Sequence, residues 1–486
     1  MIMSVFSKYK LVRILVKGGV LPPQRLTELL TIAKQAGNDH ILFGSRQDLM
    51  FHISQTNEKE ISEVLCVHNF AFVIQSASEK PFQNIVSSYV AADLLPATSW
   101  LSSGDYLKIL EQITDNYTLK INIADSKQTL VPLFYGNLNF VTSSIKDYWF
   151  LYLRFPTDYK LHRWPYLIAA DEIAKIARCI EDVTTHSAGI SIADIIETVN
   201  EKNIFHYKSI DEQLLLPEYQ QIDYEGFGRM YASNKSWAGL FWRNNKYPIT
   251  FLEDVCELCA RTTIPKICIT PWKSFIIKDI EEKDIINWHL LLGRYGITMR
   301  HSVIELNWHI PLLDKSAMRL KRYIVKKFDK RDIAVSGLSF GISSNRNELP
   351  FCSIIIKEKR LVPIPFIGSI FNKYDILHAR NFNPNSTEYI RFVSNFSLSA
   401  IPDTIATLTK KYYVGLSIGE SKELKNVELK REKQTEYYCS QCYTVYNHEY
   451  GDPFQNIDAG VSFEMLPDHY KCSICEAPKL SFLKRN

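Results

Sequence analysis

The feature that most constrains this chain is a pair of Cys-x-x-Cys motifs near its C-terminal end. Cys439 and Cys442 form the first pair, Cys472 and Cys475 form the second, and residues 443–471 separate them. Two such pairs can place four thiolates at the corners of one tetrahedron, a geometry typical of zinc or iron. The motifs therefore predict one metal ion bound by four cysteines. They leave the choice between an electron-transferring iron and a structural zinc open.

Composition and charge exclude several classes of protein. The chain has 486 residues, too many for one hydrophobic core, so we expect several domains. A net charge of +4 is too small to indicate nucleic-acid binding. We find no apolar run long enough to span a membrane and no secretory signal. Ten cysteines, six of them scattered, are typical of a reducing compartment, so we expect a cytoplasmic protein.

Two distant segments repeat one pattern at an offset of 226 residues. In the first, Pro22 precedes a helical apolar stripe, and short strands are expected at 40–43 and 49–53. In the second, Pro248 precedes a similar stripe, and strands are expected at 266–269 and 275–278. One helix on two or three strands cannot bury both of its faces alone. The two copies should therefore share an α+β core.

Cys256 and Cys259 also form a Cys-x-x-Cys pattern, which on its own could indicate a metal site. The repeat places them on the apolar stripe that Leu30 and Ala33 occupy in the first copy. Free cysteine behaves as a small buried hydrophobic residue. We therefore interpret both cysteines as core residues.

Between the second repeat and the terminal cysteines, the pattern remains mixed α/β. Residues 316–328 have the spacing of a basic amphipathic helix, and residues 332–340 are expected to form a strand and turn. Residues 417–436 alternate charges with few apolar residues, which favours a solvated, partly helical linker. A flexible tether of this kind would let a metal domain move between an electron donor and an acceptor.

The C-terminal residues carry further motifs besides the cysteines. These are Tyr437-Tyr-Cys-Ser-Gln-Cys-Tyr-Thr-Val-Tyr446, Gly451-Asp-Pro453, 457–463 and Leu466-Pro-Asp-His-Tyr-Lys-Cys-Ser-Ile-Cys475. Together they resemble the rubredoxins over all of residues 437–486. The resemblance implies one iron ion, cycling between Fe2+ and Fe3+, with the ligands Cys439, Cys442, Cys472 and Cys475. It also implies an aromatic core made of Tyr438, Tyr446, Phe463, Tyr470 and Phe482.

Three positions depart from the rubredoxin pattern. Glycine usually follows the second cysteine of each pair, where the backbone favours positive φ, but this chain has Tyr443 and Glu476. A side chain in that conformation costs roughly 1 kcal/mol. A bound metal contributes on the order of 10 kcal/mol, so the cost is tolerable. Ser473 replaces the usual proline, and no ligand is lost.

The repeat region contains four further short motifs. They are Lys17-Gly-Gly-Val-Leu21, Ser45-Arg-Gln47, Tyr117-Thr-Leu-Lys-Ile-Asn-Ile123 and Ile269-Thr-Pro-Trp272. They resemble the sirohaem-dependent nitrite and sulfite reductases, in which two ferredoxin-like half-repeats alternate with two larger α/β domains. By this resemblance, Arg46 and Lys120 stand at sirohaem-binding positions. Gln83 and Asn122 replace basic residues of that family.

The same resemblance implies what this chain lacks. The family binds a four-iron cluster through a C-x5-C and a C-x3-C motif after the second half-repeat. Here residues 303–310 and 337–342 contain no cysteine, and Cys352 is the only cysteine between Ile269 and Glu436. Sirohaem also needs several arginines and lysines to hold its carboxylates. We therefore expect neither the cluster nor sirohaem.

These patterns together predict an α+β protein made of six segments. They are a first ferredoxin-like half-repeat at 1–78, a reductase-like α/β domain at 79–237, a second half-repeat at 238–285, a second α/β domain without cluster cysteines at 286–416, a charged linker at 417–436 and a rubredoxin domain at 437–486.

The predicted function is one-electron transfer to a redox partner, in particular a nitrite or sulfite reductase, without nucleic acid or membrane. An electron carrier is favoured over an enzyme, and no catalytic residue is assigned. Two alternatives remain open. The body could retain a tetrapyrrole and act as a reductase that the rubredoxin domain supplies with electrons. The chain could instead be an interaction scaffold that binds zinc.

Overall fold

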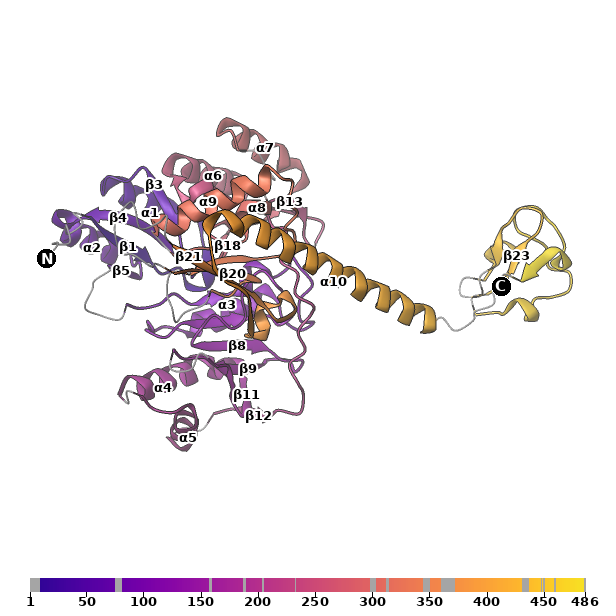
Figure 1. Ribbon diagram of the computed structural model, residues 1–486, viewed down its shortest axis with the longest axis horizontal. Helices are drawn as coiled ribbons and strands as arrows, with labels where there is room; N and C mark the ends of the chain where they lie inside the picture. Colours follow the sequence, from indigo (N-terminus) through magenta and orange to yellow (C-terminus); the bar gives the residue numbers. More distant parts are fainter. Residues whose placement is uncertain are drawn as a thin grey trace. The chain divides into compact units, whose positions relative to one another are not determined.

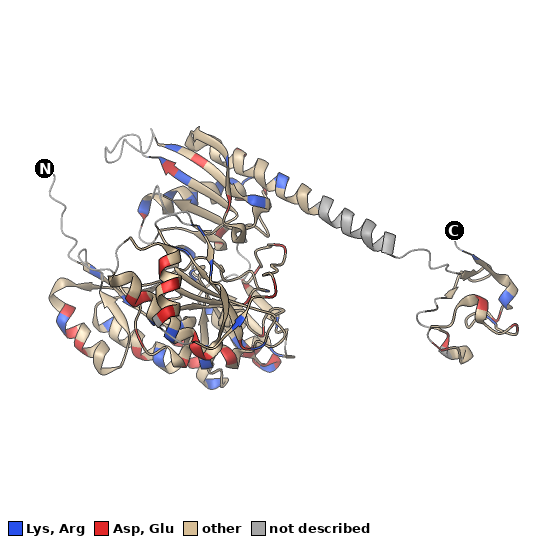
Figure 2. Cartoon of the chain, turned by 90° about the horizontal axis from the view of Figure 1, so that it is seen from below, with Lys and Arg blue, Asp and Glu red and all other residues tan. Residues whose placement is uncertain are grey.

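A computed structural model describes most of the chain in two compact units, Met1–Thr409 and Lys410–Asn486. The described residues are 9–74, 81–156, 160–186, 189–202, 205–231, 233–297, 303–311, 314–343, 350–359, 372–430, 437–446, 448, 451–458 and 460–484, without the side chains of 417–430 and 453. Lys and Arg are interspersed with Asp and Glu over the helices and strands of the larger unit (Figure 2).

The first half-repeat is a five-stranded antiparallel sheet with two helices. The strand order is β15-β3-β4-β1-β5. Its own elements are β1 (Tyr9–Ile14), α1 (Pro23–Gln35), β3 (His40–Phe43), β4 (Leu49–Ser54), α2 (Glu58–Val67) and β5 (Phe72–Ile74). Proline at the first helical position of α1 is favourable because its φ is preset and its missing N–H has no partner there.

The second half-repeat has the same construction. The strand order is β13-β14-β17-β16-β2, again antiparallel. Its own elements are β13 (Gly226–Arg229), β14 (Ser236–Leu240), β15 (Tyr247–Pro248), α6 (Ile249–Arg261), β16 (Ile267–Ile269), β17 (Phe275–Ile280) and α7 (Ile285–Arg294). The offset of 226 carries α1 onto α6 and β4 onto β17 with both ends matched.

The two half-repeats exchange one short strand each. β2 (Val20–Leu21) precedes α1 but pairs with β16, whereas β15 precedes α6 but pairs with β3. Helices α1 and α6 lie side by side (Figure 1), and a single hydrophobic core contains residues of both halves. The predicted shared core is therefore confirmed.

The Cys-x-x-Cys pattern on α6 lies in this core. Cys256 is 3% exposed and Cys259 is fully buried. Burial raises the pKa of the Cys256 thiol to about 11 and that of Cys259 further still. Thiols that resist ionisation in this way are poor metal ligands. Both cysteines are core residues, as the repeat predicts.

The first α/β region is built on a mixed sheet with the order β12-β11-β9-β8-β7-β6, and β10 pairs with β9. The strands are β6 (Val86–Ser87), β7 (Ile121–Ala124), β8 (Leu138–Thr142), β9 (Tyr148–Leu153), β10 (His162–Arg163), β11 (Tyr166–Ala169) and β12 (Tyr207–Ser209). The helices are α3 (Ser103–Gln112), α4 (Ile173–His186) and α5 (Ile192–Lys202). Helices α4 and α5 lie against one end of this region (Figure 1).

The second α/β region contains the sheet β18-β19-β20-β21-β22. The strands are β18 (Trp308–His309), β19 (Phe340–Ser343), β20 (Ile354–Lys359), β21 (Lys373–Ala379) and β22 (Tyr389–Phe396), and the helices are α8 (Val303–Leu306), α9 (Lys315–Asp329) and α10 (Ile401–Lys430). Helix α9 confirms the predicted basic helix. The strand expected at 332–340 is wrong, because Asp332 and Gly337 take positive φ and regular pairing begins only at Phe340.

The predicted linker at 417–436 is more helical than expected. Helix α10 continues as far as Lys430, and residues 431–436 lie outside the described residues. Beyond them, a small sheet has the order β24-β23-β25, with β23 (Tyr437–Cys439), β24 (Val445–Tyr446) and β25 (Phe482–Lys484). Among the described residues, no helix combines the length and apolar character needed to cross a bilayer.

Candidate metal centre

The structure brings the sulfurs of Cys439, Cys442, Cys472 and Cys475 together, with all four within 4.8 Å of one another. The Sγ atoms of Cys439 and Cys475 are 3.5 Å apart, as are those of Cys442 and Cys472. Metal–sulfur bonds of about 2.3 Å in a tetrahedron place the sulfurs about 3.8 Å apart. The donor set and its spacing therefore fit one zinc or iron ion. In the part of the chain that the structure describes, no other group of three or more Cys, His, Asp or Glu side chains converges in this way.

Each cysteine pair lies on a turn with the same hydrogen bonds. In the first turn, Tyr443 N donates to Cys439 O at 2.8 Å and Cys439 N donates to Thr444 O at 2.9 Å. In the second, Glu476 N donates to Cys472 O and Cys472 N donates to Ala477 O, at 2.9 and 2.8 Å. The site is thus built from two equivalent turns that face each other. The first cysteine of each pair is buried and the second is partly exposed.

Tyr443 and Glu476 occupy the positions at which positive φ was expected. Their φ angles are 62° and 61°, in the left-handed region that favours glycine. The backbone therefore keeps the turn geometry although both residues carry side chains, at a cost of roughly 1 kcal/mol each. Both side chains are exposed, that of Tyr443 to 74%.

An aromatic core supports the four sulfurs. Phe463 stacks on Tyr437 with the ring centroids 4.1 Å apart and contacts Tyr446 and Phe482 at 5.7 and 5.2 Å. Tyr470 lies 5.8 Å from both Tyr446 and Phe482. Four of the five predicted core aromatics are therefore in place.

Tyr438 is the exception among the predicted core aromatics. Its ring stacks instead on the exposed ring of Tyr443, with the centroids 6.3 Å apart. Alternation along β23 explains this difference, because successive residues of a strand point to opposite faces. Cys439 points inward, so Tyr437 does too, and Tyr438 points outward.

Two hydrogen bonds tie the core tyrosines to the surrounding loop. Tyr470 Oη donates to Asp452 Oδ2 at 2.8 Å, and Tyr446 Oη donates to the backbone oxygen of Val461 at 2.8 Å. Asp452 is only 6% exposed, and its other carboxylate oxygen accepts from Phe454 N at 3.2 Å. The loop between the two cysteine turns is therefore fixed by a buried, fully hydrogen-bonded carboxylate.

Thr444 was not singled out from the sequence, but it contacts a sulfur. Its hydroxyl lies 3.1 Å from Cys442 Sγ. Hydrogen bonds from the hydroxyl and backbone of Thr444 lower the pKa of Cys442. A lowered pKa favours the thiolate, the form that binds metals.

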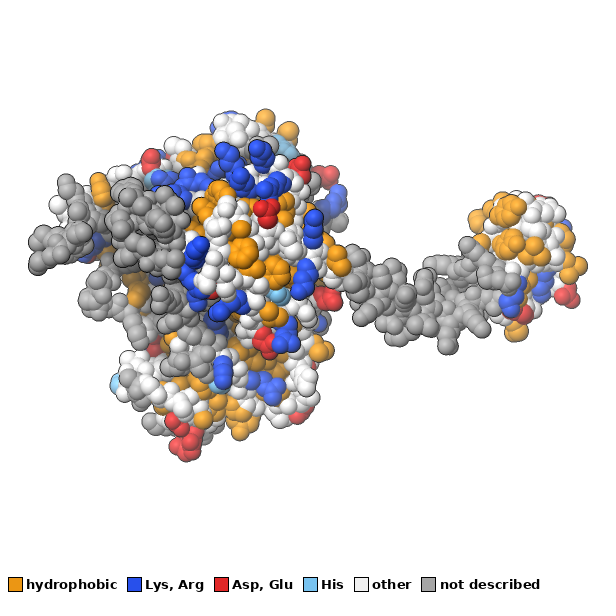
Figure 3. Space-filling model, viewed as in Figure 1, with side chains coloured by type: hydrophobic (Ala, Val, Ile, Leu, Met, Phe, Trp, Pro, Cys, Tyr) orange, Lys and Arg blue, Asp and Glu red, His pale blue; other side chains and the backbone are white. Residues whose placement is uncertain are grey.

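Apolar side chains are exposed near the partly exposed cysteines. Tyr443 follows Cys442 directly and Ile474 precedes Cys475, and they are 74% and 69% exposed. Figure 3 shows hydrophobic side chains gathered on the visible face of this unit. Exposed apolar surface next to a redox-capable site is typical of a protein-docking surface.

In the larger unit, Arg46 is buried and fully engaged. It is 5% exposed and donates from Nη1 to Asn122 Oδ1 at 2.8 Å, and from Nη2 to the backbone oxygens of Asn84 and Ile121 at 2.6 and 2.8 Å. Nε makes a longer bond to Asn84 O at 3.2 Å. Burial lowers the pKa of Arg46 to about 10. Asn122, which replaces a basic residue of the reductases, thus serves as a neutral acceptor for Arg46.

Lys120 lies near two residues that the sequence did not single out. Its Nζ is 5.6 Å from the centre of the Tyr135 ring, and that ring contacts His309 edge-on at 5.2 Å. Both ring nitrogens of His309 are buried without a hydrogen-bond partner among the described residues. Burial and the nearby Lys273 and Lys120 lower the pKa of His309 to about 3.

Lys273 is the counterpart of Gln47 in the repeat. It was not predicted from the sequence as a site residue. Both take positive φ, at 61° and 58°. Gln47 Nε2 donates to the backbone oxygens of Ser87 and Ile269, whereas Lys273 Nζ donates to Ile310 O at 2.9 Å. Burial and Lys321 lower the pKa of Lys273 to about 8. The offset of 226 could have identified this pair of turns.

A cavity of about 210 Å³ lies between Arg46 and Lys273. Arg13 and Asp48, which form an ion pair at 2.6 Å, also line it. Binding sites for drug-sized ligands have volumes of about 300–1,000 Å³. The cavity beside Arg46 is therefore smaller than the range typical of such ligands.

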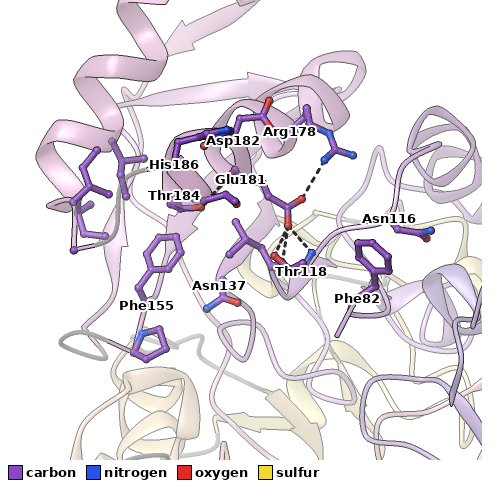
Figure 4. Close-up of a pocket in the computed structure, with 17 residues that line it drawn as sticks. Phe82, Asn116, Thr118, Asn137, Phe155, Arg178, Glu181, Asp182, Thr184 and His186 are labelled. Atoms are coloured by element: carbon purple, nitrogen blue, oxygen red, sulfur yellow. Dashed lines mark hydrogen bonds and ion pairs between the residues drawn. The ribbon is translucent and has the colours of Figure 1, made fainter. Parts of the chain in front are cut away.

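A larger pocket of about 750 Å³ opens beside α4 and α5 (Figure 4). Glu181 on α4 is its central charged group, and its Oε1 accepts from Thr118 Oγ1 at 2.6 Å and from Leu119 N at 3.2 Å. Arg178 reaches the other carboxylate oxygen at 3.4 Å. These hydrogen bonds tie Thr118 and Leu119 to α4.

The site and its small aromatic fold define a four-cysteine metal domain. Residues 436–482 match the rubredoxin family. The chain is 47% identical over 49 residues to Rubredoxin-2 of Chlorobaculum tepidum, covering 94% of that protein. It is 44% identical over 48 residues to Probable Rubredoxin-2 of Methanocaldococcus jannaschii, covering 86% of that protein. Each match takes up 10% of this chain, which belongs to the rubredoxin family through this domain.

The larger unit matches a different group of proteins. Residues 7–66 match the nitrite/sulfite reductase ferredoxin-like half domain. The solved structure of the Mycobacterium tuberculosis NirA protein aligns with a TM-score of 0.61, covering 83% of this chain and 81% of that one. The sequence identity is 15%, so the likeness shows the fold. The predicted fold class is confirmed.

Proposed function

We propose that this protein transfers single electrons through one iron ion held by Cys439, Cys442, Cys472 and Cys475, and that a nitrite or sulfite reductase receives them. The observation that carries the proposal is the convergence of four sulfurs on two equivalent turns in a domain of the rubredoxin family. Iron bound by four thiolates gains and loses one electron.

The surrounding residues keep the sulfurs in place during that change. Paired backbone hydrogen bonds fix both cysteine turns, and the aromatic core holds the turns against each other. A rigid donor set requires little rearrangement when the charge changes, and its surroundings tune the potential. Cys442 and Cys475 are the ligands that reach the surface, so electrons would pass on their side, next to Tyr443 and Ile474.

The reductase-like body supports the choice of partner. A reductase that accumulates several electrons one at a time would benefit from a carrier fused to a docking body, because tethering raises the effective concentration of the carrier. The larger unit would dock onto the partner through surfaces of the reductase fold. This part of the proposal rests on the fold likeness, and co-purification from cells grown on nitrate tests it. Recovery of no sirohaem enzyme would remove the partner assignment.

The body itself is proposed to work without sirohaem or a four-iron cluster. Arg46 donates to three neutral oxygens and the cavity beside it is small. The visible spectrum of the full chain tests this point. Iron–thiolate bands alone support a carrier, and a Soret band would instead indicate a tetrapyrrole enzyme. A colourless, zinc-loaded protein would indicate the interaction scaffold.

A cysteine variant with a matched control tests the ligand set. Cys472→Ser should lose the iron–thiolate bands and most of the iron, because three thiolates remain. Cys66→Ser changes an exposed cysteine outside the site and should keep both. Full iron content in Cys472→Ser would refute the assignment.

A further inference from the structure

The two cysteine turns share their backbone hydrogen bonds but differ in one side chain. In the first turn, Cys439 N donates to Thr444 O. In the second, Cys472 N donates to Ala477 O, so Thr444 and Ala477 stand at the same position of the two turns. Thr444 carries a hydroxyl and Ala477 does not. The four-cysteine site is therefore asymmetric in a way that the cysteine spacing does not reveal.

The Thr444 hydroxyl is hydrogen bonded to a metal-binding sulfur. Its oxygen lies 3.1 Å from Cys442 Sγ. A sulfur that binds a metal has lost its proton, so the hydroxyl must be the donor. Among the described residues, no other side chain besides the cysteines themselves is hydrogen bonded to any of the four sulfurs. Thr444 is half-buried and branched at Cβ, which restricts its rotation and holds the hydroxyl in place.

The backbone, in contrast, acts in the same way in both turns. The N–H groups of Thr444 and Ala477 each interact with the sulfur two residues earlier in the chain. Those sulfurs belong to Cys442 and Cys475, the two partly exposed cysteines. The hydroxyl is thus the difference between the two ligands that reach the surface, because it gives Cys442 a hydrogen bond that Cys475 does not receive.

We infer that the Thr444 hydroxyl raises the reduction potential of the iron site by donating to the Cys442 sulfur. Reduction adds one electron and no proton, so the four thiolates and the iron together gain one negative charge. A hydrogen bond to a charged acceptor strengthens as that charge grows, and this donor therefore stabilises the reduced state more than the oxidised one. The potential in turn limits which electron donors can reduce the site. This inference rests on the proposed electron transfer through iron.

The reduction potentials of iron-loaded, full-chain variants test the role of the hydroxyl. Thr444→Val removes it and keeps the branched shape of the side chain. At a fixed applied potential, this variant should have a reduced-to-oxidised ratio lower by at least about threefold, which corresponds to about 28 mV for one electron. Thr444→Ser retains a hydroxyl, and its potential should lie closer to that of the wild type than to that of Thr444→Val.

Thr444→Ala is a second way of removing the hydroxyl. It gives the first turn the residue that the second turn already carries as Ala477, so this turn geometry accommodates it. Its potential should be lowered as in Thr444→Val.

Ser440→Ala is the matched control. Ser440 lies between Cys439 and Cys442 and is exposed, and its hydroxyl contacts no sulfur within the described part of the chain. Its replacement should leave the potential unchanged. Metal analysis shows whether each variant binds one iron.

Two results would overturn the inference. One is an equal potential for the wild type and Thr444→Val when both bind one iron. The other is an equal shift in Thr444→Ser and Thr444→Val, which would assign the effect to the shape of the turn. Absence of iron from the wild-type protein, or iron that takes up no electron, would refute the proposed function and this inference with it.

Discussion

Replacing Tyr470 by phenylalanine removes one hydroxyl and leaves the aromatic core of the rubredoxin domain intact. That hydroxyl donates to Asp452 Oδ2 at 2.8 Å, and the carboxylate is 6% exposed. Without it, Asp452 retains one partner, Phe454 N at 3.2 Å. A hydrogen bond to a charged group contributes about 1.5–3 kcal/mol. We expect Tyr470→Phe to lower the free energy of unfolding of the domain by that amount.

Tyr446→Phe provides the matched control for this experiment. Its hydroxyl donates at the same distance, 2.8 Å, but to the neutral backbone oxygen of Val461. A hydrogen bond between neutral groups contributes about 0.5–1.5 kcal/mol. Denaturant unfolding of the full chain, followed by loss of the metal–thiolate absorption, measures both variants. If Tyr470→Phe costs no more than Tyr446→Phe, the reasoning about the buried carboxylate is refuted.

Three further changes should have distinct results. Unfolded histidine gains its proton near pH 6.5, whereas buried His309 does so near 3. Stability of the body should therefore fall as the pH drops between these values, by up to about 1.4 kcal/mol per pH unit. His309→Phe should flatten this fall in thermal unfolding curves, and an unchanged slope would contradict the assignment. Gln47→Ala removes the hydrogen bonds from Gln47 to the buried backbone oxygens of Ser87 and Ile269, and should destabilise the body by about 1–3 kcal/mol without changing iron content. Arg46→Gln should leave the visible spectrum unchanged, and loss of an absorption band would reveal a bound cofactor.

The metal domain was the most predictable part of the chain. Four ligands on two turns must converge if they bind one ion, so cysteine spacing alone brings distant residues together. The sequence also indicated the half-repeats, because an apolar stripe with helical spacing must face a core wherever it occurs. The exchange of β2 and β15 between the half-repeats could not be predicted from the apolar pattern. It depends on which sheet edge each short strand reaches in space.

The wrong predictions have local physical causes. Tyr438 was assigned to the core by resemblance, although alternation along β23 from the buried Cys439 places Tyr437 there instead. The strand expected at 332–340 is interrupted by two residues with positive φ. The environment of Arg46 was not predictable either. Its acceptors on Asn84, Ile121 and Asn122 come from other segments, and contacts of that kind are not encoded in local spacing.

An anaerobic redox titration of the full chain, combined with metal analysis, tests the central claim most directly. We predict one iron per chain, uptake of one electron per iron, and reversible loss of the iron–thiolate colour on reduction. Zinc in place of iron, or colour that does not respond to a reductant, would contradict it.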